Sequence, residues 1–254
     1  MKQITVLTMF PEYFDSFLNG VLVQRARTKG ICQIRVVDIR DYADGSYRHL
    51  DDSPCGGGPG MIMKCEPVIA ALRANKTEQT RSYIMDPGGQ TLSQKLVHDL
   101  SKEDDLLLLA GHYEGLDERI YEECDGCLSI GDYILSGGEL AAQVIIDSII
   151  RLQEGVLAND STVEESFETD RLEYPQYTQP AEYEGRRVPE VLLSGNHEKI
   201  RRWRLKESLR TTYRNRPDLL KKRILNEEEQ LLLCEVMEEE QESPGEAGGE
   251  EQNE

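Results

Sequence analysis

Over the first 155 residues, short apolar runs alternate with segments in which apolar residues recur at helical spacing. The runs predict strands over residues 4–10, 31–39, 82–87, 106–111 and 127–131, and Pro87 is expected to stop the third. The periodic segments predict helices over residues 11–22, 66–75, 93–102, 116–123 and 138–153. This alternation is typical of an α/β fold with a mostly parallel sheet covered by helices.

The helix expected over residues 138–153 is apolar on several faces, because Val144, Ile145, Ile146, Ile149 and Ile150 follow one another around it. A helix that is apolar nearly all round is buried, either in a core or at a subunit contact.

The rest of the 254 residues has a different texture. Residues 155–185 form a long polar connection with prolines and tyrosines, which is either functional or a linker. The chain turns helical again from about Val191, and its end is acidic and of low complexity. We therefore predict four parts: a sheet domain, a linker or lid, a basic helical domain and a disordered acidic tail, over residues 1–158, 159–185, 186–237 and 238–254.

The net charge of −19 would seem hostile to nucleic acid, but it is unevenly distributed. Residues 186–223 carry 13 Lys and Arg against four Asp and Glu, whereas residues 226–254 carry 12 Glu and no Lys or Arg. The local sign of the charge decides whether a polyanion can dock, so the basic module remains a candidate for RNA.

No apolar run approaches the roughly 20 residues that a membrane span needs, so no membrane partner is expected. The first residues, MKQITVLTMFPEYF, are expected to form a strand and not a secretory signal. Six cysteines in such a chain fit free thiols in a reducing, cytoplasmic compartment.

Several familiar sites are absent from the sequence: a P-loop, a G-x-G-x-x-G run, H-E-x-x-H and G-x-S-x-G. Cys124 and Cys127 have C-x-x-C spacing, but no second pair follows, so two ordinary thiols are favoured over a structural zinc.

Three glycine-bearing loops follow predicted strands: MDPGGQ (85–90), AGHYEGLDERI (110–120) and SIGDYILSGGEL (129–140). Ligands of parallel sheets bind beyond the carboxyl ends of the strands, and glycines there let the backbone approach a flat ligand. The acidic side chains of Glu114 and Asp132 suit amine or ribose hydroxyl groups and not phosphates. Ordinary turn glycines remain the alternative interpretation.

The basic helix predicted near residues 197–214 surrounds Trp203 and Tyr213 with Lys and Arg, which suits phosphate binding and base stacking. A solvated basic helix paired to the acidic body is the alternative. Glu164 and Glu165 place carboxylates in the connecting segment, where a solvated charge pair is the simpler interpretation.

Five motifs in order resemble one known family: DSPCGGGPGMIM (52–63), GHYEGLDERI, SIGDYILSGGEL, EYPQYTQP (173–180) and VLLSGNHEKIRRWRLKESL (191–209). Together they resemble bacterial tRNA (guanine-N1)-methyltransferases, over about Ile4 to Leu225. The resemblance implies methylation of N1 of guanosine 37, next to the anticodon. It also implies a deep trefoil knot in the sheet domain, a small helical C-terminal domain, and a homodimer whose active sites are shared between subunits.

The resemblance implies S-adenosylmethionine as the methyl donor, bound in the knot. Matching motifs assign the donor to Pro87, Gly111, Tyr113, Glu114, Ile130, Gly131, Asp132, Tyr133, Ile134, Leu135, Gly137 and Gly138. They assign the anticodon arm of tRNA to Gly57, Gly58, His197, Arg201, Arg202, Arg204 and Lys206. The linker is expected to close over the partner's donor site as a lid.

This sequence departs from the family pattern at several places. Glu165 stands where the family commonly has Asp as the general base, and the loop after Arg151 is one residue shorter than usual. Cys55 and His112 replace a common Tyr and Arg, and Asp86-Pro87-Gly88-Gly89 replaces Ser-Pro-Gln-Gly. The backbone positions that require glycine and proline are kept, so donor binding is expected to persist.

The expected mechanism is removal of the guanine N1 proton by Glu165 while Arg151 stabilises negative charge on O6. A carboxylate is a weak base for this proton, so its site must raise its pKa or stabilise the guanine anion. Glu164 is the first alternative base. The family resemblance suggests that Mg²⁺ assists the reaction, although the sequence shows no recognisable set of cation ligands. A related enzyme for another RNA base and a non-catalytic RNA-binding protein remain the rival classes.

Overall fold

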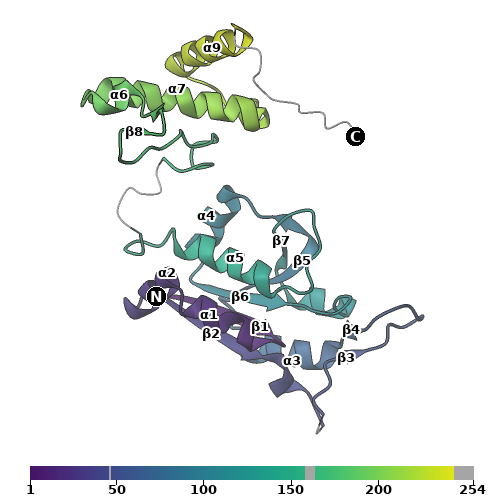
Figure 1. The fold of residues 1–254 in the computed structure, drawn as a ribbon. Coiled ribbons are helices and arrows are strands. Elements are labelled where there is room, and N and C mark those ends of the chain that lie inside the picture. The colour runs from purple at the N-terminus through teal and green to yellow at the C-terminus, as the bar shows by residue number, and fades with distance from the viewer. Residues whose placement is uncertain (46, 158–163, 243–254) are drawn as a thin grey trace. The chain divides into compact units, whose positions relative to one another are not determined.

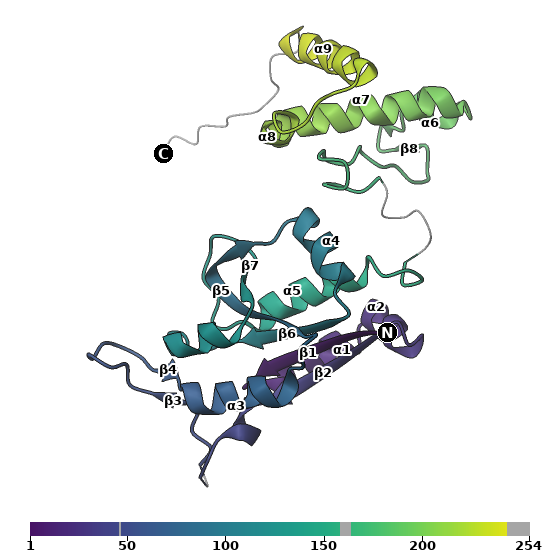
Figure 2. The ribbon, with the colours of Figure 1, turned by 180° about the vertical axis from the view of Figure 1, so that it is seen from behind.

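The structure is a computed structural model that describes residues 1–45, 47–157 and 164–242. The chain divides into two compact units, Met1–Asn159 and Asp160–Glu254, and each has its own helices and core (Figures 1 and 2). None of the helices over the described residues is long and apolar enough to cross a membrane.

A five-stranded, wholly parallel sheet forms the centre of the first unit (Figure 1). In spatial order its strands are β2 (Cys32–Asp38), β1 (Lys2–Thr8), β6 (Asp105–Ala110), β5 (Arg81–Thr91) and β7 (Gly126–Ser129). The central strand β6 is buried from Leu106 to Ala110, as expected for a strand covered on both faces. The predicted α/β fold with a mostly parallel sheet is confirmed.

Helices cover both faces of this sheet. One face carries α2 (Val21–Thr28), α4 (Gln94–Lys102) and α5 (Glu139–Ile150), and the other carries α3 (Cys65–Asn75) and the 3-10 segments η2 (Ile39–Tyr42) and η3 (Glu118–Glu123).

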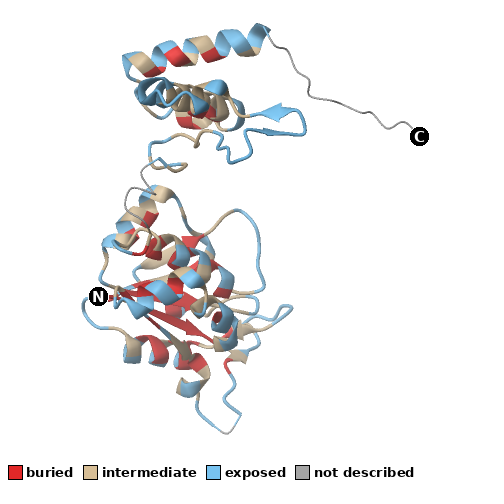
Figure 3. Ribbon diagram, turned by 60° about the vertical axis from the view of Figure 1, so that its left-hand side comes forward, coloured by how far each residue is buried: buried red, intermediate tan, exposed pale blue. Residues whose placement is uncertain are grey.

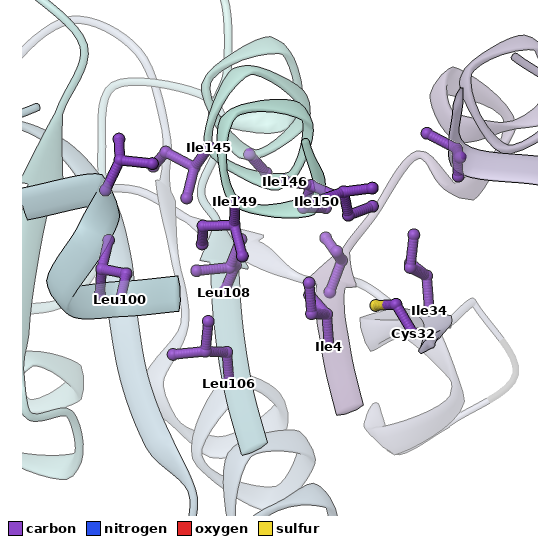
Figure 4. Packing of buried hydrophobic residues seen from close by; sticks show 14 of the residues in the cluster. Ile4, Cys32, Ile34, Leu100, Leu106, Leu108, Ile145, Ile146, Ile149 and Ile150 are labelled. Atoms are coloured by element: carbon purple, nitrogen blue, oxygen red, sulfur yellow. The ribbon is translucent and has the colours of Figure 1, made fainter. Parts of the chain in front are cut away.

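Side chains of β6 alternate between the two cores, because successive residues of a strand point to opposite faces. Leu106 and Leu108 lie in the core under α5, whereas Leu107 and Leu109 lie in the core under α3. Figure 4 shows Leu108 facing Ile149 of α5, and Figure 3 shows that the buried residues concentrate in the strands and on the inner faces of the helices.

Strand β5 runs past Pro87 to Thr91, so the prediction that it stops at the proline is wrong. It pairs with β7 in two stretches, and a register shift between Met85 and Gln90 places both opposite Leu128. Because the residues inside this irregularity leave the ladder, the missing N–H of Pro87 costs no hydrogen bond.

The helix predicted over residues 11–22 is broken into η1 (Pro11–Phe14), α1 (Asp15–Leu18) and α2. The break falls at Gly20, which adopts an extended backbone and caps α2 by accepting from the Gln24 N–H at 2.8 Å. Between the second predicted strand and the helix expected to begin at residue 66 lies β3 (Asp51–Asp52), which pairs with β4 (Ile62–Met63) as a short antiparallel ribbon.

The second unit is helical with one small hairpin, β8 (Glu182–Tyr183) and β9 (Arg186–Arg187). Its helices are α6 (Glu190–Leu193), α7 (His197–Asn215), α8 (Pro217–Leu220) and α9 (Glu227–Glu242). Helices α7 and α9 pack together, with Leu209, Leu232 and Val236 fully buried.

Helix α9 continues through Glu242, so the acidic segment predicted to be disordered from residue 238 is helical over its first part. Glu239 and Glu240 form ion pairs with Arg210 of α7, and these contacts stabilise the end of α9. Composition alone does not reveal such contacts. Residues 243–254 lie outside the described residues.

Candidate active site

A cavity of about 350 Å³ lies at the carboxyl ends of β6 and β7 and beside the register shift of β5, where the sequence places its glycine loops. The structure brings together in its wall all the predicted donor-binding residues except Asp132, namely Pro87, Gly111, Tyr113, Glu114, Ile130, Gly131, Tyr133, Ile134, Leu135, Gly137 and Gly138. Asp132 is exposed beside the cavity wall. The volume falls in the range of small-molecule sites, about 300–1,000 Å³.

Glycines let the loop after β6 and the start of α5 meet at the cavity. The Gly138 N–H donates to the Gly111 carbonyl at 2.8 Å, and His112 pairs with Gly137. A Cβ on Gly138 would lie 2.8 Å from both Ala110 Cα and Met85 Cβ, closer than carbon atoms can pack.

A tyrosine that the sequence analysis missed shapes one side of the cavity. The Tyr121 hydroxyl donates to Asp86 Oδ2 at 2.7 Å, and Asp86 Oδ1 accepts from the Gly88 N–H at 2.7 Å. Burial first, and then the bond to Asp86, raise the pKa of Tyr121, so the phenol stays a donor. Asp86 therefore orients the turn that holds Pro87 in the wall.

A buried carboxylate, also missed, lies behind the wall. Glu139, the first residue of α5, is 1% exposed and accepts from Thr8 Oγ1 at 2.8 Å. His112 Nδ1 lies 3.6 Å from Glu139 Oε2. The N-terminal end of α5 favours a negative charge there. In the sequence, Glu139 can be noticed as a carboxylate that directly follows two glycines and begins an apolar helix.

The loop with the predicted RNA-binding residues Gly57 and Gly58 contacts Glu114 in the cavity wall. Both glycines are exposed with positive φ, +79° and +138°, which is the conformation that glycine tolerates. Further along the loop, a Cβ on Gly60 would lie 2.2 Å from the Glu114 side chain, and the Glu114 N–H donates to the Met61 carbonyl. The loop therefore packs directly against the cavity wall.

The two predicted catalytic residues belong to different units. Arg151 caps the C-terminal end of α5 in the first unit, and its N–H donates to the Asp147 carbonyl at 3.2 Å. Glu165 is half-buried in the second unit, in a loop that packs on α7.

The predicted RNA-binding cations lie on α7, and most of them are paired with carboxylates. The N-terminal end of α7 begins with exposed His197. Arg201 binds Glu198 and Glu228, Arg202 binds Glu235, and Lys206 binds Glu235 and Glu239. The partners beyond Glu198 come from α9, so within the second unit this basic helix is paired with the acidic C-terminal helix.

Arg204 differs from these cations. Its guanidinium carbon lies 4.9 Å from the centre of the Tyr174 ring, and its Nη1 lies 3.7 Å from Glu164 Oε2. The buried Nε has no hydrogen-bond partner among the described residues. These groups line a second cavity of about 580 Å³ within the second unit.

Metal ligation receives no support from the described residues, where no group of three His, Cys, Asp or Glu side chains is placed to hold an ion. Cys124 and Cys127 carry free thiols. Burial raises the pKa of Cys124 to about 11 and also raises that of Cys127, so both thiols stay protonated at neutral pH.

Comparison with known proteins agrees with this architecture. Residues 1–222 match the model of the family described as tRNA (Guanine-1)-methyltransferase TrmD. A tRNA (guanine-N(1)-)-methyltransferase of Dictyoglomus turgidum is 46% identical over 240 residues, which cover 94% of this chain and 98% of the relative. One from Syntrophomonas wolfei is 49% identical over 236 residues, covering 92% and 97%. The chain therefore belongs to the tRNA (guanine-1)-methyltransferase TrmD family.

Proposed function

We propose that this enzyme transfers a methyl group from S-adenosylmethionine to N1 of guanosine 37 in tRNA. Its family membership supports methylation of tRNA guanine, and the 350 Å³ cavity carries the assignment of the donor. Chemically, the sulfonium–methyl bond breaks as the N1–methyl bond forms. The N1 proton passes to a carboxylate, and S-adenosylhomocysteine leaves.

The cavity wall fits such a donor. Backbone at Gly111, Gly131 and Gly138 allows close approach of a flat base, and Leu128 and Ala141 add apolar surface. The Glu114 carboxylate in the wall suits a ligand that carries a sulfonium and an ammonium group. When bound, the donor supplies an electrophilic methyl group, while the chain supplies position, shape and charge.

The proton acceptor we propose is Glu165. An ordinary Glu has a pKa of about 4.3, which makes it a weak base for the guanine N1 proton, and each unit of pKa difference between the two groups costs about 1.4 kcal/mol. Proton transfer to Glu165 therefore requires that the guanine anion be stabilised. Arg151 would stabilise the charge that develops on guanine O6. Glu164 is the first alternative base, and its Oε2 accepts from the Tyr174 hydroxyl at 2.9 Å.

Assembly and location belong to the same proposal. Helix α5 buries Ile145 and Ile149 but exposes Leu140 and Val144, 47% and 45% exposed, on one side. An apolar pair at this spacing supports a homodimer that shares its active sites. The knotted sheet, a cytoplasmic location and closure by the linker are parts of the proposal that follow from the family resemblance. No step is assigned to Mg²⁺.

The test of the function is nucleoside analysis after incubation of full-length protein with labelled donor and unmodified tRNA transcript. We expect N1-methylguanosine at position 37, and its loss from a transcript that differs only at that position. Methylation elsewhere would favour a related enzyme with another target. Absence of donor binding in calorimetry would favour a non-catalytic RNA-binding protein.

The ion pairs between α7 and α9 give a prediction for RNA binding. Replacing Glu235, Glu239 and Glu240 by Gln frees the cations of α7 and is expected to tighten tRNA binding by about tenfold. The salt dependence should also steepen, because each additional phosphate contact adds about 0.7–0.9 to the slope of log K against log[salt]. Bonds to Lys206, Arg210 and Arg214 lower the pKa values of these three carboxyls, so all are charged at neutral pH.

The matched control replaces three exposed glutamates of the same helix, Glu227, Glu238 and Glu242, by Gln. Both triple variants lose the same charge, but only the first removes carboxylates that α7 binds. Filter binding at several salt concentrations separates them. Equal gains from the two variants would indicate a general charge effect and contradict the specific prediction.

A further inference from the structure

The residues around Glu165 form a compact loop, defined as residues 164–174. The Phe167 N–H donates to the Arg171 carbonyl at 2.9 Å, and the Glu173 N–H donates to Ser166 Oγ at 3.0 Å. Phe167 and Asp170 have φ values of +73° and +52°, a region that non-glycine residues rarely adopt. Such backbone persists only where surrounding contacts hold it, so the loop has one preferred shape.

Two hydroxyl groups of α7 hold the last part of this loop, at Leu172. Thr212 Oγ1 accepts from the Leu172 N–H at 2.9 Å, and Ser208 Oγ donates to the Leu172 carbonyl at 2.5 Å. Both side chains belong to residues that are nearly fully buried, Ser208 at 3% exposed and Thr212 at 0%. Both polar backbone groups of Leu172 are thus satisfied by one face of a single helix.

Two further contacts anchor the loop. The Tyr174 hydroxyl donates to Glu164, which joins the two ends of the loop, and the Tyr174 ring lies against Arg204 of α7. Arg171 Nη1 bonds at 2.9 Å to Glu229 Oε1, a side chain that is 4% exposed. The loop is therefore fixed to α7 and to the start of α9 through contacts that lie entirely within the second unit.

We propose that Ser208 and Thr212 are positioning residues for the catalytic carboxylate of Glu165, an inference that rests on the function proposed above. Glu165 lies seven residues before Leu172 in a loop whose shape depends on the Leu172 anchor. The helix that carries the RNA-binding cations thereby also fixes the proton acceptor. General-base catalysis depends on placement within about 1 Å, so loss of the anchor should lower the rate of the chemical step.

The test is a double-mutant cycle on the full-length protein with unmodified tRNA and S-adenosylmethionine. Thr212→Val is expected to lower the single-turnover methylation rate by about 10- to 100-fold, with unchanged tRNA affinity. Thr212→Ser, which keeps the hydroxyl, should restore most of the rate. In the Glu165→Gln background, Thr212→Val should change the rate by less than about twofold, because the group it positions is already absent.

Thr211→Val is the matched control, since it removes a threonine hydroxyl from the adjacent, half-buried position of α7. It should leave the rate unchanged. Ser208→Ala, which removes the other bond to Leu172, carries the same expectation as Thr212→Val and replaces it if that variant unfolds.

The outcomes separate the inference from the proposed function. Equal rate losses from Thr212→Val with and without Glu165 would overturn the positioning role alone. A loss of tRNA affinity that explains the whole rate change would do the same. An unchanged rate in Glu165→Gln would overturn the assignment of the base itself, and the positioning role with it.

Discussion

Gly138→Ala is expected to lower donor affinity by about 100-fold and to destabilise the first unit by about 1–3 kcal/mol, the usual cost of overpacking. The added Cβ would lie 2.8 Å from Ala110 Cα and Met85 Cβ, and 3.1 Å from the Gly111 nitrogen. None of these atoms is the end of a flexible side chain. The start of α5 must therefore move away from β5 and β6, which opens the cavity wall.

The backbone itself would accept an alanine, because Gly138 has φ −82° and ψ −5°. The expected loss is therefore steric and not conformational. Gly126→Ala is the control, since the nearest atoms to its Cβ are ring carbons of Tyr83 at 3.8 Å, an ordinary contact. Calorimetric titration with donor and thermal unfolding measure the two effects. Equal donor affinities in the two variants would contradict the prediction.

The alternation of strands and helices along the first unit could be predicted from the sequence, because apolar runs and helical periodicity report burial directly. Leu106 to Leu109 are buried on both faces and stand out as a continuous run. The strand end predicted at Pro87 was wrong, because a local rule about proline says nothing of a register shift, which depends on the partner strand β7.

The candidate site was accessible where it consists of backbone. Glycine loops after strands predict a cavity wall, and the structure gathers those loops around one cavity. Side chains that act through long-range contacts were missed: Tyr121 meets Asp86 across 35 residues, and Glu139 meets Thr8 across 131. A sequence pattern has no access to such pairs.

The consequence of the uneven charge along the chain also depends on long-range packing. The basic segment and the acidic end were both visible in the composition, but only packing of α9 on α7 shows that they neutralise each other. Half-exposed pairs such as Arg202 with Glu235 contribute about 0–1 kcal/mol each, so they tune RNA binding more than they hold the unit together.

Glu165→Gln is expected to lower the single-turnover methylation rate by about 1,000-fold, within the range of 10²–10⁴ that general-base catalysis contributes. The amide keeps the size of the side chain but cannot accept the N1 proton at neutral pH. Donor and tRNA affinities should be unchanged, because neither depends on this proton transfer. Rapid-quench methylation at saturating donor and tRNA measures the rate, and calorimetry and filter binding measure the affinities.

Two further variants decide whether position or charge matters at this site. Glu164→Gln removes the neighbouring negative charge but keeps an oxygen that can accept from the Tyr174 hydroxyl, so it is expected to lower the rate only modestly. Glu165→Asp shortens the side chain by one methylene to the residue that the family commonly carries, and should retain most of the activity if the loop can move by that length. A full rate in Glu165→Gln with a collapsed rate in Glu164→Gln would transfer the base to Glu164. The pair of measurements therefore shows which of the two neighbouring carboxylates of the loop accepts the proton.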